Sequence, residues 1–110
     1  MQIDVSKEGD IVVVVVEGDL DASTSPDLRA KFEEFIGQGE NQYVIDLAGV
    51  PFMDSSAIAA LVNLFKRVSI GAGDVKLCGL RGEIIKIFQL TRLDRAFDIF
   101  DTRADAIASL

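Results

Sequence analysis

The sequence predicts a single α/β domain, spanning residues 1–110, with a small mixed β-sheet and packed α-helices. The chain has the length of one small domain, and 49% of its residues are hydrophobic, enough to bury a core. Short β-branched runs also alternate with stretches of helical periodicity. The predicted order of elements is β-β-α-β-α-β-α-β-α, without a linker or an internal repeat.

The chain opens with a predicted β-hairpin. Apolar and polar residues alternate from Gln2 to Ser6, which is typical of an edge strand. The β-branched run from Ile11 to Val16 favours a strand that is at least partly covered on both faces. Because a hairpin pairs antiparallel whereas strands separated by a helix pair in parallel, we expect a mixed sheet.

A helix, a strand and a longer helix follow. The segment Thr24, Ser25 and Pro26 is typical of a helix start, and one of the two hydroxyls is expected to supply the capping oxygen. The strand Gln42–Leu47 then leads across a turn into a helix that begins near Ser55. The polar stripe of this helix is so narrow that we expect most of its circumference to be buried.

Shorter elements complete the predicted order. They are a buried strand at Val75–Cys78, a helix at Gly82–Leu90, a connector at Thr91–Arg95, an edge strand at Phe97–Phe100, and a last helix capped by Asp101 or Thr102.

The net charge and the hydropathy of the chain argue against nucleic-acid binding and against membrane insertion. The formal net charge of -7 argues against a direct nucleic-acid binder, which needs a basic surface to neutralise phosphates. No stretch approaches the roughly 20 apolar residues that span a bilayer, so we expect no membrane insertion. Met1 is not followed by a secretory leader pattern, and Cys78 is the only cysteine. A cytoplasmic, reducing location is therefore expected.

The residue types argue against an enzyme. The chain has no histidine, which removes the usual base for a serine nucleophile and the usual zinc ligand. Lys66 lies three helical turns from Ser55, and no phosphate-binding glycine loop is present. Asp46 and Asp54 without further oxygen donors make a poor magnesium or calcium site. We expect a non-catalytic binding module without a metal or cofactor.

The segment Asp54-Ser55-Ser56, at the mouth of the long helix, permits two interpretations. Each of these side chains is a good N-cap and can accept a hydrogen bond from the free N–H groups of the first turn. A serine at a helix N-terminus is also placed where the backbone stabilises an added phosphate of about 1.5 to 2 negative charges. Both roles can coexist, since one serine can cap while its neighbour is modified.

Three segments, in order, resemble one known family. They are Gly18-Asp19-Leu20-Asp21, Phe52-Met53-Asp54-Ser55-Ser56 with the small-apolar helix behind it, and Ile87-Phe88-Gln89-Leu90-Thr91-Arg92-Leu93. Together they resemble bacterial anti-sigma factor antagonists of the STAS domain family, and the resemblance covers nearly the whole chain. It implies that Ser55 is a phosphoacceptor, and that Asp21, Asp54 and Ser56 help to form a partner-binding surface.

The resemblance also implies a partner-switching cycle. The unphosphorylated antagonist binds an anti-sigma factor that is also a serine kinase, and so frees the sigma factor. The kinase uses ATP to phosphorylate Ser55, which switches binding off, and a PP2C-type phosphatase restores the antagonist.

Two alternatives remain open. The family pattern usually has glycines where this chain has Ala57 and Ala59, and this departure motivates a second class. In that class a STAS domain is a permanent structural subunit of a membrane transport complex for lipids or anions. A small enzyme with Ser55 as its nucleophile is the third possibility, and it lacks an apparent base.

Overall fold

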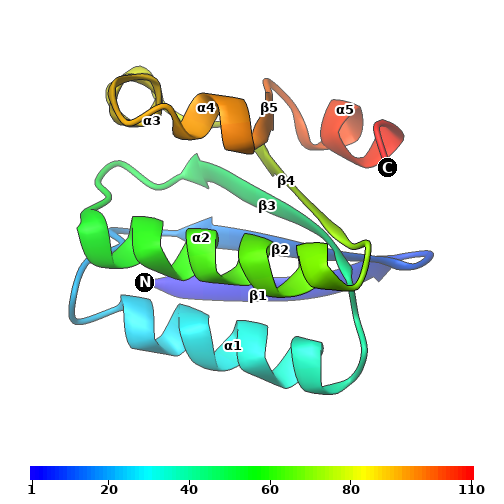
Figure 1. Cartoon of the computed structure of the whole chain (residues 1–110). Helices are drawn as coiled ribbons and strands as arrows, with labels where there is room; N and C mark the ends of the chain where they lie inside the picture. The colour runs from blue at the N-terminus through cyan, green and yellow to red at the C-terminus, as the bar shows by residue number, and fades with distance from the viewer.

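The computed structural model describes residues 1–110. It shows a five-stranded mixed sheet with helices packed against it (Figure 1). The strands are β1 (Gln2–Glu8), β2 (Ile11–Glu17), β3 (Gln42–Gly49), β4 (Asp74–Cys78) and β5 (Asp98–Phe100). The helices are α1 (Ser25–Gly37), α2 (Ser55–Ile70), α3 (Gly82–Leu90), α4 (Leu93–Ala96) and α5 (Arg103–Ala108). The α/β fold class and the order of strands are confirmed, and α4 is an addition to the predicted elements.

The sheet keeps the order of the chain, β1-β2-β3-β4-β5. β1 and β2 pair antiparallel, as the predicted hairpin requires, in a register from Gln2 opposite Glu17 to Glu8 opposite Ile11. β2, β3, β4 and β5 pair in parallel. The sheet is therefore mixed, and the carboxyl ends of its parallel strands lie at one edge.

The two faces of the sheet bury different clusters. One face packs with α1 and α2, which lie side by side, around a core of 20 buried residues that includes Ile45 and Leu61 (Figure 1). On the opposite face, α5 places Ala106 against Val44 and Cys78. α2 contacts both the sheet and α1, and it buries one face, made of Ala57, Ala60, Leu61, Leu64 and Val68. Its exposed stripe is wider than predicted, because Ser55, Ser69 and Ile70 near its ends are exposed as well.

The start of α1 differs from prediction. Thr24 is the N-cap residue, but its hydroxyl makes no capping bond and instead donates to the Asp19 carbonyl at 2.8 Å. The carboxylate of Asp21 accepts from the N–H groups of Ser23 and Thr24 instead. The prediction that a hydroxyl of Thr24 or Ser25 caps this helix is therefore wrong. The first helical amides bond backbone carbonyls instead: the Ser25 N–H donates to the Asp21 carbonyl at 2.8 Å, and the Asp27 N–H donates to the Thr24 carbonyl at 3.1 Å.

The predicted connector also contains structure. Arg92 adopts the left-handed conformation, with φ of 64°, and α4 begins at the next residue. A non-glycine residue rarely occupies that region. The predicted end of α3 at Leu90 is confirmed, whereas the short helix α4 inside the connector was not predicted. At the end of the chain, Thr102 caps α5 as predicted by accepting from the Asp105 N–H at 3.2 Å. None of the helices has both the length and the apolar character needed to cross a bilayer.

Candidate functional site

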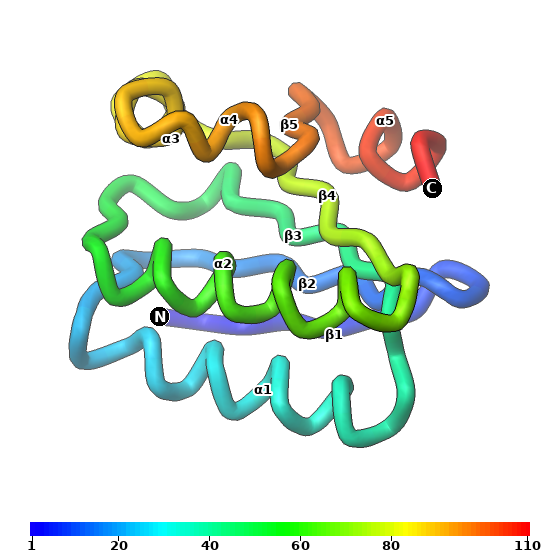
Figure 2. The backbone as a smooth tube through the Cα atoms, in the orientation of Figure 1, coloured from blue at the N-terminus to red at the C-terminus, as the bar shows by residue number.

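The loops that follow β2 and β3 meet at the N-terminus of α2 (Figure 2). Leu20 and Met53, both buried, form an isolated parallel bridge between the loops. The Leu20 N–H donates to the Phe52 carbonyl, and the Asp54 N–H donates to the Leu20 carbonyl, each at 3.0 Å. This bridge fixes residues 18–24 and 50–57 as one surface, which we call the α2 corner.

Asp54 holds the α2 corner together through both of its carboxylate oxygens. Oδ1 accepts from the N–H groups of Ser56 at 2.9 Å and Ala57 at 3.3 Å, which caps α2. Oδ2 accepts from the Ala22 N–H at 3.1 Å, across 32 residues of sequence. The side chain of Asp54 therefore caps α2 and also holds the loop that follows β2 against the start of this helix.

The acidic groups of the α2 corner are held ionised. The hydrogen bond from the Ser56 hydroxyl, with further bonds from backbone N–H groups, lowers the pKa of Asp54 below 3.8. The hydrogen bonds from the Ser23 hydroxyl and N–H likewise lower the pKa of Asp21 below 3.8. At neutral pH the corner therefore carries two carboxylates whose positions are fixed by hydrogen bonds.

The two serines have different surroundings. Ser56 is half-buried, and its hydroxyl donates to Asp54 Oδ1 at 2.5 Å and lies 3.2 Å from the hydroxyl of Ser25. Ser25 itself is only 1% exposed. The exposed hydroxyl of Ser55 takes part in none of these side-chain hydrogen bonds. Of the two hydroxyls, that of Ser55 is the one a second protein can reach.

The surface around Ser55 is partly apolar. Phe52 is 52% exposed, which is unusual for a phenylalanine beside a buried core. Ala59 lies one helical turn beyond Ser55 and is also exposed, whereas Ala57 is fully buried. An exposed aromatic ring beside fixed carboxylates and an unengaged hydroxyl suits protein recognition better than catalysis.

The structure places Asp21, Asp54, Ser55 and Ser56, which the resemblance assigns to one surface, together in the α2 corner. The contact of Ser56 with Ser25 was not predicted, because 31 residues separate them and no local pattern links them. No cluster of three or more His, Cys, Asp or Glu side chains suited to a metal ion occurs in the structure.

Comparisons with known proteins agree with this geometry. The family model described as STAS domain matches residues 2–106. The anti-sigma-B factor antagonist of Bacillus subtilis (strain 168) is 30% identical over 99 residues, 90% of each chain. The anti-sigma F factor antagonist of Paenibacillus polymyxa is 22% identical over 111 residues, 100% of this chain and 95% of that protein.

A solved structure shows the same architecture. The crystal structure of an anti-sigma factor antagonist from Mycobacterium paratuberculosis matches with a TM-score of 0.89 and 26% identity, over 98% of this chain and 92% of that one. The family match spans nearly all of the chain, and it confirms the resemblance of the three sequence segments. The chain belongs to the STAS domain family.

Proposed function

We propose that this protein is an anti-sigma factor antagonist whose binding is switched off by phosphorylation of Ser55. Relatives that cover most of the chain are anti-sigma factor antagonists, which supports the class of function. The observation that carries the switch is the contrast between the two serines: Ser55 is exposed and unengaged, whereas Ser56 is bonded to Asp54.

In the proposed cycle, the unmodified α2 corner binds an anti-sigma factor that is also a serine kinase. The exposed Phe52 supplies apolar contact, and the Asp21 and Asp54 carboxylates supply charge. The partner surface is therefore expected to be basic around an apolar pocket.

Phosphorylation would change this surface and leave the fold intact. The first-turn amides of Ser56 and Ala57 already bond Asp54, so a phosphate on Ser55 would stay outside the helix end and face the partner. It adds about 1.5 to 2 negative charges next to an ionised carboxylate. Added bulk and charge at the centre of the contact release the partner. A PP2C-type phosphatase would then restore the antagonist in the cytoplasm.

Phosphoryl transfer to single-serine variants tests the acceptor. The full chain is incubated with its cognate kinase and ATP, and the phosphate is counted by intact mass. We expect Ser56→Ala to gain one phosphate and Ser55→Ala to gain none. Phosphorylation of Ser55→Ala at the parent rate would exclude Ser55 as the acceptor.

Charge substitution tests the switch itself. Ser55→Asp is expected to weaken kinase binding at least about tenfold, a loss of roughly 1.4 kcal/mol. Ser69→Asp makes the same change at an exposed position near the other end of α2 and should bind like the parent. Unchanged affinity of a folded Ser55→Asp would refute the charge switch. Copurification with a membrane transport complex, unaffected by ATP, would favour a structural subunit instead.

A further inference from the structure

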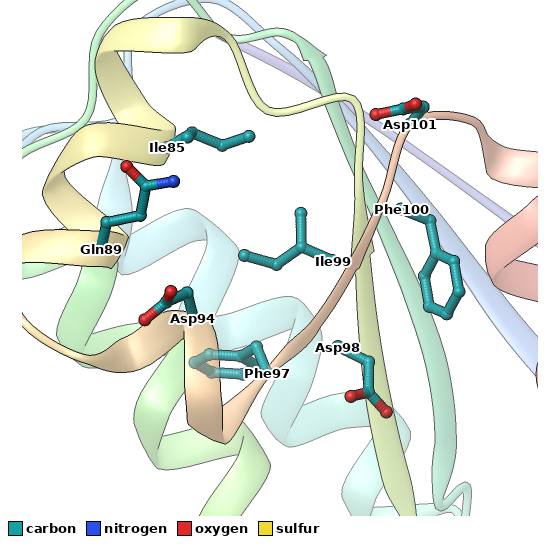
Figure 3. Close-up of a pocket in the computed structure, with 8 residues that line it drawn as sticks. All are labelled: Ile85, Gln89, Asp94, Phe97, Asp98, Ile99, Phe100 and Asp101. Carbon is teal, nitrogen blue, oxygen red and sulfur yellow. The ribbon is translucent and has the colours of Figure 1, made fainter.

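A cavity of about 390 Å³ opens at the free edge of β5 (Figure 3). α3, α4 and the residues that follow α4 form its walls, and β5 forms its base. Its lining residues are Ile85, Gln89, Asp94, Phe97, Asp98, Ile99, Phe100 and Asp101. None of them belongs to the α2 corner, so the cavity is a separate surface of the protein.

The backbone of β5 offers unpaired hydrogen-bonding groups at this edge. β5 is the last strand of the sheet and pairs only with β4. The Phe100 carbonyl accepts from the Gly79 N–H at 3.1 Å, on the side of β4. Because backbone groups alternate in direction along a strand, the N–H and C=O of Ile99 point away from β4. An open edge of this kind can accept another strand.

The apolar side chains of Ile85, Phe97 and Ile99 line the cavity beside this edge, and we call this surface the apolar seat. Ile85 and Gln89 project from α3 toward Ile99, which points back toward the helix (Figure 3). Phe97 lies beneath them, 1% exposed, with its ring centroid 6.0 Å from that of Phe88. The packed phenylalanines keep the seat in place, while Ile85 and Ile99 remain partly exposed.

The charge around the cavity has one sign. Three aspartates and no basic residue line it. Asp98 is already paired with Lys76. Asp94 and Asp101 are exposed and take part in none of the ion pairs of the structure. Two uncompensated carboxylates therefore flank the seat and favour a cationic occupant.

We propose that the β5 edge is a second docking surface, which binds an extended basic segment of a partner protein by strand addition. The segment bonds the N–H and C=O of Ile99, as in other cases of strand addition. An apolar side chain of the segment fills the space between Ile85 and Ile99. Lysine or arginine residues on either side meet Asp94 and Asp101. This surface acts independently of the phosphorylation state of Ser55.

Three pentapeptide probes test the proposal by NMR titration of the ¹⁵N-labelled full chain. The first has a central valine with two lysines on each side, the second has glutamates in place of the lysines, and the third is the lysine peptide with a methylated backbone. We expect saturable shifts of the Ile99 and Asp101 amides with the first peptide only. Absence of these shifts, or equal binding of either control peptide, would overturn strand addition by a basic segment.

Paired variants test the charge requirement. Asp94→Asn with Asp101→Asn should weaken the lysine peptide about four- to twenty-five-fold, because each exposed ion pair contributes about two- to fivefold. Asp4→Asn with Asp10→Asn changes net charge equally in the exposed β1–β2 hairpin and should alter affinity about twofold at most. Equal losses in both pairs would show nonspecific attraction and refute the site. Ser55→Asp should bind the peptide like the parent, so this result does not depend on the proposed switch.

Discussion

At the scale of single residues, Asp54 has the largest number of roles in the α2 corner. Its carboxylate caps α2, orients the Ser56 hydroxyl and holds the loop at Ala22. It does so without engaging Ser55, so the hydroxyl of that residue stays outside the hydrogen-bonded network. A neutral or shorter side chain at this position therefore affects two loops and the helix start together.

The role of Asp54 predicts a pH-dependent stability difference between Asp54→Asn and the parent. The pKa of Asp54 in the folded protein lies below 3.8, so its stabilising effect is complete above that pH and is lost as pH falls through the folded pKa. We expect the parent to have the higher urea midpoint at pH 7, and the difference to shrink progressively below pH 3.8.

Ser55→Ala is the matched control for that comparison, since it lies next to Asp54 and removes a hydroxyl outside the bonded network. The urea midpoint of Ser55→Ala should equal that of the parent both at pH 7 and below pH 3.8. A difference between Asp54→Asn and the parent that stays constant with pH would contradict the assignment of the capping charge to Asp54.

At the scale of elements, α2 contains Ala57 and Ala59, the two alanines at which the sequence departs from the family pattern. Ala57 is buried, so its methyl group packs inside and does not meet a partner. Ala59 is exposed on the same side of α2 as Ser55 and adds a methyl group to the surface. Only the second alanine can alter recognition, while both strengthen the helix by about 1 kcal/mol each relative to glycine.

The C-terminal helix α5 is attached to β3 by one charged contact. Arg103 Nε donates to Asp46 Oδ2 at 3.0 Å, and Asp46 is only 8% exposed. Arg103→Ala leaves this carboxylate without its cation. We expect a loss of about 1–2 kcal/mol in the free energy of unfolding, since water partly screens the half-exposed arginine.

Hydrogen exchange locates the effect of that substitution. Amides of α5 should exchange faster in Arg103→Ala, while those of α2 keep their protection. Arg95→Ala removes an exposed arginine that makes no ion pair, and its stability should stay within about 0.5 kcal/mol of the parent. Equal exchange of α5 in Arg103→Ala and the parent would show that apolar packing alone holds the helix.

At the scale of the whole molecule, three buried groups, Tyr43, Lys76 and Cys78, are expected to make the fold sensitive to alkali. Burial raises the pKa of Cys78 from 9.0 to about 11 and that of Tyr43 from 10.0 to about 12. Burial lowers the pKa of Lys76, but its bonds to Asp74 and Asp98 outweigh this and raise it above 10.5. Each group binds its proton more tightly in the folded state than in the unfolded state.

Stability is therefore expected to fall as pH rises from about 9 toward 11, because the unfolded thiol ionises before the folded one. Urea midpoints measured across this range test the expectation. Cys78→Ala, which removes the thiol, should show a shallower decline than the parent. A parent midpoint that does not fall between pH 9 and 11 would show that these groups do not govern alkaline stability.

Much of the fold follows from local pattern, and its exceptions have physical causes. Hydrophobic patterning alone predicts the central strands and the long helix, because β2, β3 and β4 are nearly continuous buried runs and α2 buries one face. The site residues Asp54, Ser55 and Ser56 are adjacent in sequence, so a helix-start pattern identifies them. The contact of Asp54 with Ala22 is not predictable locally, because it depends on how two loops pack.

The five strands lie in the sheet in the same order as in the chain. This order has a consequence for how the protein folds during its synthesis. Each strand that leaves the ribosome finds the previous one at the growing edge, so no strand must be inserted between two others. The sheet can therefore grow in one direction during translation, with the β1–β2 hairpin as its starting point. Of the five strands, β5 is the last to leave the ribosome, and it joins the sheet next to β4.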